Sequence, residues 1–257
     1  GLYQSQNIQV VPGDGQGGFG VPVISAGFPS SVTARPLGIV LGDVNGDGKL
    51  DVVAFDYASS GAVSVSRGDG AGNLGSPTVY NFYDTRPSNL NDPHYVVWGA
   101  ALADVNRDGK PDLIVAAANN YFSSKGDVWV LLNDGAGNFS MPATYVWTRG
   151  LGHGDVPAQF VTAGDLDGDG NCDIVVTSGF GQFGSGNVVT ILSGNGTGAF
   201  TPTLGLPFPV TPNGRANHAQ GVVIADINGD GLPDLVVSAS DIGATRTGGV
   251  TVFRNTG

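Results

Sequence analysis

The sequence contains no glutamate, because all 22 of its acidic residues are aspartate. Helical proteins use glutamate freely as a good helix former, whereas aspartate favours caps and turns. The absence of glutamate therefore argues against a helical fold and predicts that the carboxylates lie in loops. The 43 glycines and 15 prolines require frequent turns of the 257-residue chain. This composition predicts an all-β fold.

Basic residues, cysteine and long apolar runs are also scarce. Only 11 lysines and arginines give a formal charge of −11, which argues against a nucleic-acid partner because such a partner requires a basic surface. The single cysteine, Cys172, cannot form an internal disulfide bond. No run approaches the roughly 18 apolar residues of a membrane span, so we expect no membrane insertion. Residues Gly1–Val10 lack the features of a signal peptide, so a secreted form is expected to have lost its signal.

An aspartate-rich nonapeptide occurs four times, and its copies begin 61 residues apart. Each copy has the pattern D-x-[DN]-x-D-G-x-x-D or a close variant and lies between two short apolar runs, which predict buried strands. A third strand, a glycine-rich turn and a fourth strand follow. Four antiparallel strands in about 60 residues make one blade of a β-propeller. The copies are Asp43–Asp51, Asp104–Asp112, Asp165–Asp173 and Asp226–Asp234.

We therefore predict a single β-propeller-type domain over residues 1–257, built of four-stranded antiparallel blades with a calcium-binding loop between the first and second strands. Residues 33–93, 94–154 and 155–215 make complete repeats, residues 216–257 an incomplete last repeat, and residues 1–32 an additional partial blade with a strand pair.

The strand count predicts an unpaired strand. Four first, four second, five third and four fourth strands make 17, one more than four blades need. Val21–Ser25 is a candidate fourth strand that completes the C-terminal blade and closes the ring. We then expect Asn7–Val11 or Val250–Phe253 to form an edge contact, within a larger ring or with another copy of the chain.

The nonapeptide has the chemistry of a calcium site. Its first, third, fifth and ninth side chains and the carbonyl of its seventh residue converge into an oxygen cage, because glycine turns the chain sharply. Six to eight oxygen ligands at about 2.3–2.6 Å are typical of Ca²⁺. We predict about four Ca²⁺ ions. The expected side-chain ligands are Asp43, Asn45, Asp47, Asp51, Asp104, Asn106, Asp108, Asp112, Asp165, Asp167, Asp169, Asp173, Asp226, Asn228, Asp230 and Asp234, and the expected carbonyl ligands are those of Lys49, Lys110, Asn171 and Leu232.

Other interpretations of the loops fit less well. An EF-hand needs glutamate at its twelfth position, which here holds an apolar residue in every copy. Zinc prefers histidine or cysteine, and Cys172 stands where the other copies have leucine or proline. Aspartate turns without metal remain the alternative, although 13 of the 22 carboxylates lie in these loops, where like charges require a cation.

The aspartate nonapeptide between two apolar strands, followed by Gly-x-Val-x-Val and by Asn133-Asp-Gly-Ala-Gly-Asn-Phe139, resembles the FG-GAP/VCBS repeat family. This family provides the calcium-bearing blades of integrin α-subunit heads, fungal seven-bladed lectins and many secreted bacterial proteins. The resemblance implies a secreted or cell-surface β-propeller. It also implies calcium loops on one face and ligand-contacting connections on the other.

The connections opposite the aspartate loops hold aromatic, histidine and arginine residues, which suit sugars or carboxylated glycans. The alternative is that these side chains only bond loop backbone or cap the sheets. The candidate ligand-binding residues are Arg35, Tyr83, Arg86, His94, Tyr121, Trp147, Arg149, His153, Arg215 and His218.

Three functions follow from these observations. The first is an extracellular recognition module without catalytic activity, lectin-like or adhesive, that binds a glycan or a protein. The second is a structural subunit of an extracellular filament or sheath that assembles through strand edges. The third is a polysaccharide lyase or hydrolase, in which His153 and Asp155 are the available pair, although the sequence lacks a nucleophile and base motif.

Overall fold

The fold of the chain is seen in a computed structural model. It describes residues 6–29, 36–56, 61–82, 95–119, 126–140, 144–147, 158–178, 188–207, 218–240 and 248–257. These residues form 17 β-strands and no helix, so the all-β prediction is confirmed. Within these ranges there is accordingly no helix with the length and apolarity needed to cross a membrane.

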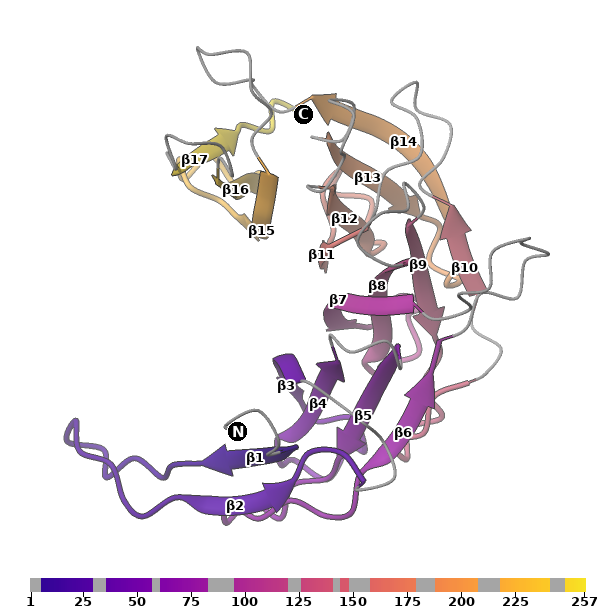
Figure 1. Cartoon of the computed structure of the whole chain (residues 1–257). Helices are drawn as coiled ribbons and strands as arrows, with labels where there is room; N and C mark the ends of the chain where they lie inside the picture. The colour runs from indigo at the N-terminus through magenta and orange to yellow at the C-terminus, as the bar shows by residue number, and fades with distance from the viewer. Residues whose placement is uncertain are drawn as a thin grey trace.

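The strands form five antiparallel sheets that follow one another along the chain (Figure 1). The first sheet is a strand pair, and three four-stranded blades and one three-stranded blade follow it. The strand pair is β1 (Asn7–Val10) and β2 (Val23–Ala26); the first blade is β3 (Pro36–Gly42), β4 (Asp51–Asp56), β5 (Ala62–Ser66) and β6 (Thr78–Asn81); the second is β7 (Tyr95–Ala103), β8 (Asp112–Asn119), β9 (Gly126–Leu131) and β10 (Thr144–Trp147); the third is β11 (Phe160–Gly164), β12 (Asp173–Ser178), β13 (Val188–Gly194) and β14 (Phe200–Pro207); and the fourth is β15 (His218–Ala225), β16 (Asp234–Ser240) and β17 (Gly248–Phe253).

Each blade packs face to face against its neighbours, so its second strand is apolar on both faces. In β8, Leu113 and Val115 pack against the first blade, whereas Ile114 and Ala116 pack against the third. Successive side chains of a strand point to opposite faces, and both faces here are covered. This explains why the second strands read as continuous apolar runs and not as alternating ones.

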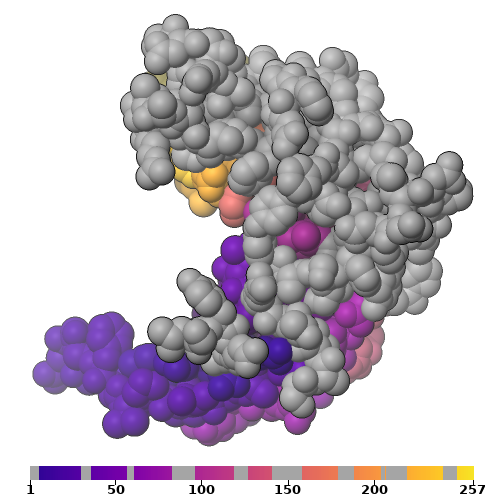
Figure 2. Space-filling view, in the orientation of Figure 1, coloured from indigo at the N-terminus to yellow at the C-terminus, as the bar shows by residue number. Residues whose placement is uncertain are grey.

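The strand pair stands in the place of a blade that precedes the first one. Ile8 and Phe28 are buried against Val52, Ala54 and Ala62 of the first blade. In Figure 2 this indigo segment extends from one end of the molecule. The strand pair therefore continues the stack of blades in the N-terminal direction.

The expected closure of the ring by Val21–Ser25 is wrong. Strand β2 pairs with β1, with Val10 opposite Val23, and no described strand pairs with the outer edge of β17. A hairpin between neighbouring strands closes a much shorter loop than pairing with a strand at the other end of the chain, and loop closure costs more entropy as the loop lengthens. The strand pair and the fourth blade lie at the two ends of an open arc (Figure 1).

The turn after each third strand connects a blade to the preceding one. Phe139, which closes the turn of the second blade, makes an edge-to-face ring contact with Tyr80 of the first blade, with ring centroids 5.8 Å apart. The backbone N–H of Phe139 donates to the Tyr80 hydroxyl at 3.0 Å. The core between these blades therefore includes a residue from a turn.

We predict that Phe139→Ala lowers the free energy of unfolding by about 3–5 kcal/mol, because it leaves a cavity between two blades. The matched control is Phe19→Ala, at the same turn position of the strand pair, where the side chain is 77% exposed against 6% for Phe139. The control is expected to change the free energy of unfolding by less than about 0.5 kcal/mol. Urea denaturation of dilute protein measures both, and equal losses in the two variants would contradict the packing described.

Candidate functional site

The four aspartate nonapeptides form the connections between first and second strands, as predicted. These aspartate loops join β3 to β4, β7 to β8, β11 to β12, and β15 to β16. Because every blade has the same strand order, the four loops lie at the same edge of the stacked sheets. We call this edge the loop edge.

The first aspartate of each loop folds the loop around its own carboxylate. Asp43 Oδ1 accepts the N–H of Gly46 at 2.8 Å, and its Oδ2 accepts the N–H of Gly48 at 2.7 Å. The third and fifth residues accept hydrogen bonds from backbone groups two residues further on. Asn45 Oδ1 accepts the N–H of Asp47, and Asp47 Oδ1 accepts the N–H of Lys49. A short side chain reaches the backbone two residues on, which explains the use of aspartate and asparagine here.

The ninth aspartate is buried and joins the loop to the rest of its blade. Asp51 Oδ2 accepts the N–H of Val44 at 2.9 Å, and Oδ1 accepts the N–H of Gly68 at 2.8 Å. Gly68 begins the turn after the third strand. The other three blades repeat both contacts through Asp112, Asp173 and Asp234.

The negative charges of neighbouring aspartates within a loop repel one another. Burial raises the pKa of Asp112 above its usual range, and the carboxylates of Asp108 and Asp104 raise it further. Burial likewise raises the pKa of Asp173, which also lies near Asp167 and other aspartates. A bound cation removes both effects, because it favours the ionised carboxylates.

Two of the first aspartates, Asp43 and Asp226, behave in the opposite way. The N–H of Gly48 holds the pKa of Asp43 below its usual range. The N–H of Gly231 does the same for Asp226. These carboxylates are therefore ionised at neutral pH and available to a cation.

The oxygens of the third loop lie close enough together to share one ion. One carboxylate oxygen from each of Asp165, Asp167 and Asp173 lies within 4.8 Å of the other two. The other loops have asparagine at the third position, which provides an uncharged oxygen instead. Their donors are also oxygens only, and this donor set fits calcium.

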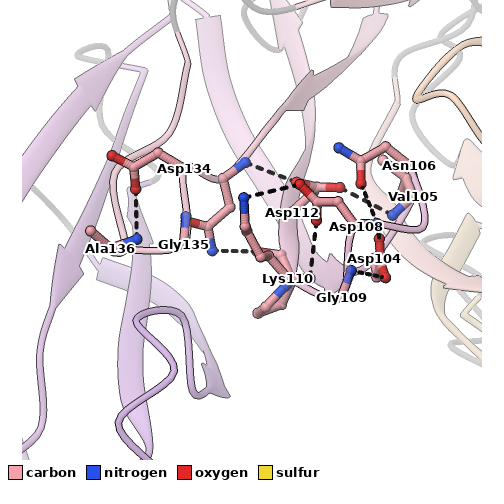
Figure 3. A network of polar contacts seen from close by, with 12 residues as sticks. Asp104, Val105, Asn106, Asp108, Gly109, Lys110, Asp112, Asp134, Gly135 and Ala136 are labelled. Atoms are coloured by element: carbon pink, nitrogen blue, oxygen red, sulfur yellow. Dashed lines mark hydrogen bonds and ion pairs between the residues drawn. The ribbon is translucent and has the colours of Figure 1, made fainter.

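Figure 3 shows the second loop, where Asp104, Asn106, Asp108 and Asp112 gather beside the turn that contains Asp134. Lys110 Nζ lies 3.3 Å from Asp108 Oδ2. Exposed ion pairs of this type contribute little to stability.

Sequence reasoning missed a link between the second and third loops. Arg107 has a φ of 62°, at a position where Gly46, Gly168 and Gly229 have φ between 73° and 77°. Its Nε donates to the Gly170 carbonyl at 3.0 Å, and its Nη2 donates to the Asp169 carbonyl at 3.2 Å. In the sequence, this link is indicated only by an arginine at a position where the other three repeats have glycine.

Two asparagines at the ends of third strands were also missed. Asn133 Nδ2 donates to the Val44 carbonyl at 2.8 Å and to the Pro111 carbonyl at 2.9 Å. Two repeats further along the chain, Asn255 Nδ2 donates in the same way to the carbonyls of Leu166 and Pro233. Each asparagine therefore joins the aspartate loop of its own blade to that of the preceding blade.

Cys172 packs beside the core between the second and third blades. Burial raises the pKa of its thiol to about 11, and the charge of Asp173 acts in the same direction. The thiol is therefore protonated at neutral pH, whereas the thiolate is the form that binds metal.

Most candidate ligand-binding residues lie outside the described residues. The backbones of Trp147 and His218 are described, at the end of β10 and at the start of β15. The direction of these strands places both residues at the edge opposite the loop edge, as predicted. The candidates outside the described ranges are Arg35, Tyr83, Arg86, His94, Tyr121, Arg149, His153 and Arg215.

A cavity of about 780 Å³ lies between the third and fourth blades. Five of its apolar lining residues stand at repeat positions that belong to the core around Phe139 between the first and second blades. The other half of its lining is polar and includes Asp167 and Asp173 of the third aspartate loop. The apolar lining residues are Leu166, Ile191, Leu206, Pro233, Leu235, Val252 and Phe253.

Comparison with known proteins agrees with this architecture. The family model described as FG-GAP-like repeat matches residues 43–115, 104–176 and 165–237. The chain is 31% identical to mouse integrin alpha-IIb over 170 residues, which are 62% of this chain and 16% of the integrin. It is 29% identical to integrin alpha pat-2 of Caenorhabditis briggsae over 77% of this chain and 17% of that protein.

A third relative is human cartilage acidic protein 1, which is 26% identical over 84% of this chain and 30% of that protein. In these three proteins the matched region therefore spans less than one third of the relative's length.

We predict that Arg107→Ala lowers the melting temperature by roughly 2–4 °C, because two hydrogen bonds between adjacent loops are lost without relief of the positive φ. Gly46→Ala is the matched control, since an added Cβ there meets no atom within 4 Å and introduces backbone strain alone. Differential scanning calorimetry compares the variants. A melting temperature unchanged in Arg107→Ala but lowered in the control would show that the contacts between the loops do not stabilise the fold.

Proposed function

Because the chain belongs to the family of FG-GAP-like repeat proteins, we propose that it is a calcium-stabilised recognition module that acts in adhesion outside the cell. The observation that carries this proposal is the set of four aspartate loops at one edge of the stack of blades, the third of which brings three carboxylates within 4.8 Å of one another. The relatives named integrin and cartilage acidic protein support an adhesive and extracellular role. The proposal includes no catalytic step.

Calcium is proposed to bind all four aspartate loops. The side chains at the first, third, fifth and ninth positions of each loop, together with the carbonyls of Lys49, Lys110, Asn171 and Leu232, would hold the ions. Bound calcium supplies positive charge that stabilises the ionised carboxylates. Four ions would reduce the formal charge from −11 to −3. The role is structural, because the ninth aspartate connects each loop to two parts of its blade.

Recognition is proposed to occur at the edge opposite the loop edge. The positions of Trp147 at the end of β10 and of His218 at the start of β15 support this proposal, and the other candidates are expected in the connections of the same edge. Functional residues often lie on loops that a rigid scaffold positions. The proposed partners are a glycan or an extracellular protein.

The calcium proposal is tested by titrating chelator-treated protein in a calorimeter, where we expect about four ions per chain. At 100 times the dissociation constant, each site adds about 2.7 kcal/mol to the free energy of unfolding, so the melting temperature rises. Asp169→Asn is expected to remove one ion. Asp134→Asn, in a turn outside the aspartate loops, is the matched control and keeps all of them.

The same titration at acid pH gives a second comparison. In the metal-free fold the raised pKa of Asp112 and Asp173 makes the folded state bind protons more tightly than the unfolded chain does. In metal-free protein these two groups therefore contribute stability as the pH falls towards the ordinary pKa of 3.8, whereas Asp43 and Asp226, whose pKa is lowered, contribute less over the same range. Calcium binding weakens over the same range, so its effect on the melting temperature shrinks. A melting temperature that excess chelator leaves unchanged at pH 7 contradicts the structural role.

The recognition proposal is tested by applying the calcium-loaded chain to arrays of glycans and of extracellular proteins. We expect saturable binding, weakened at least tenfold, or about 1.4 kcal/mol, by the double substitution His94→Ala and His153→Ala. Lys49→Ala, on the loop edge, is the control and leaves binding unchanged. Absence of saturable binding contradicts the proposal, and turnover of an acidic polysaccharide that His153→Ala abolishes replaces it with an enzymatic function.

A further inference from the structure

Three asparagine–glycine pairs of the described structure lie in turns that share one geometry. They are Asn45-Gly46 in the first aspartate loop, Asn228-Gly229 in the fourth, and Asn195-Gly196 in the turn after β13. In each pair the asparagine Oδ1 accepts the backbone N–H of the second residue after it, at 2.8 Å in the two loops and at 3.0 Å in the turn. The φ of the glycine is 73° or 77° in all three. A fourth pair, Asn213-Gly214, lies outside the described residues.

Asparagine followed by glycine is prone to deamidation, because glycine has no side chain that hinders its nitrogen. The glycine nitrogen loses its proton and attacks the asparagine Cγ, so that a C–N bond forms and ammonia leaves. Water then opens the resulting succinimide ring and gives aspartate or isoaspartate. The state of the glycine N–H therefore controls the rate of the first step.

The three pairs differ in the partner of this glycine N–H. Gly46 donates to Asp43 Oδ1 at 2.8 Å, and Gly229 donates to Asp226 Oδ1 at 2.7 Å. Within the described part of the chain, the N–H of Gly196 has no acceptor. A carboxylate at this distance disfavours loss of the amide proton, since like charges repel. The hydrogen bond must therefore break before the nitrogen of Gly46 or Gly229 reacts.

Exposure to water does not separate the pairs, but the asparagine carbonyl does. Asn228 and Asn195 are both exposed, so water reaches both. The Thr197 hydroxyl donates to Asn195 Oδ1 at 2.7 Å, and this second hydrogen bond polarises the carbonyl that the nitrogen attacks. In the two loops the corresponding residue is aspartate, which has no such donor when it is ionised. Both differences favour reaction at Asn195.

We propose that Asn195 is a site of spontaneous deamidation in the folded chain, whereas Asn45 and Asn228 are protected while their aspartate loops stay closed. The two protected residues react only from an open loop, in which the glycine N–H has left its carboxylate. The turn of Asn195 adjoins the third aspartate loop, because Gly196 lies against the side chain of Asn171. Deamidation there adds a negative charge beside a proposed calcium site.

Calcium controls the two protected residues, a step that rests on the proposed function. An ion that binds only the closed loop lowers the population of the open loop. At 100 times the dissociation constant this population falls roughly 100-fold, and the deamidation rate falls with it. The N–H of Gly196 has no carboxylate to leave, so the rate at Asn195 is expected to be independent of calcium.

The proposal is tested by incubating the whole chain in mildly alkaline buffer, with calcium or with excess chelator, and by measuring the deamidated peptides by mass spectrometry. The rate of each pair is divided by its rate in the chain unfolded in urea, which removes the effect of the neighbouring sequence. Without metal we expect this relative rate to be roughly tenfold or more higher at Asn195 than at Asn45 and Asn228, because a hydrogen bond to a charged group must break first. Calcium is expected to lower the rate at Asn45 and Asn228 alone.

Substitution of Asp43 isolates the protecting hydrogen bond. Without metal, Asp43→Ala removes the acceptor of Gly46, so the relative rate at Asn45 is expected to approach that at Asn195. Asp43→Asn keeps the shape of the side chain without its charge, and is expected to raise the rate at Asn45 by a smaller factor. Asn228 lies in an unaltered loop of the same molecule, so its constant rate shows that each variant is folded.

Three results overturn the proposal. The first is an equal relative rate at Asn195 and at the two loop residues in the folded chain. The second is a rate at Asn45 that neither substitution of Asp43 changes. The third is calcium binding, seen in the calorimeter, that leaves the rates at Asn45 and Asn228 unaltered. If the calorimeter detects no calcium binding, the proposed function fails instead, and the metal-free rates still decide whether the loops protect their asparagines.

Discussion

The buried carboxylate at the end of each aspartate loop is the interaction on which the other features of the structure depend. One oxygen of Asp51 holds the start of its loop through Val44, and the other holds the turn after the third strand through Gly68. The same pair of contacts recurs in every blade. A buried negative charge is costly unless hydrogen-bond donors or a cation compensate it. The blade edge and the proposed metal site are thus parts of one arrangement.

The packing of one blade on the next depends on the same loops. Val44 gives its N–H to the buried carboxylate, and its side chain belongs to the core between the first and second blades. Its carbonyl accepts from Asn133 of the following blade. Arg107 adds a contact between the second and third loops. The conformation of a loop therefore affects both the shape of its own blade and the position of its neighbour, so the proposed calcium binding would act on the whole arc.

This arrangement separates the surfaces of the molecule by role. The loop edge is rigid, because its polar groups bond one another and the adjacent blades. The opposite edge carries the connections whose composition suits recognition, including those that adjoin Trp147 and His218. At the two ends of the arc Phe19 and Val250 are exposed, whereas the corresponding Phe139 and Val63 are buried between blades.

The sequence by itself determined the blade, because every copy of the repeat contains the same strand periodicity, turn glycines and loop aspartates. All 17 expected strands are present among the described residues. Tertiary structure decided what lies next to each blade. It paired β2 with β1 instead of β17, buried Val63 but exposed the corresponding Val250, and directed Arg107 to the next loop. Local patterns are identical in copies with and without a neighbour, so burial and cross-blade contacts follow only from long-range packing.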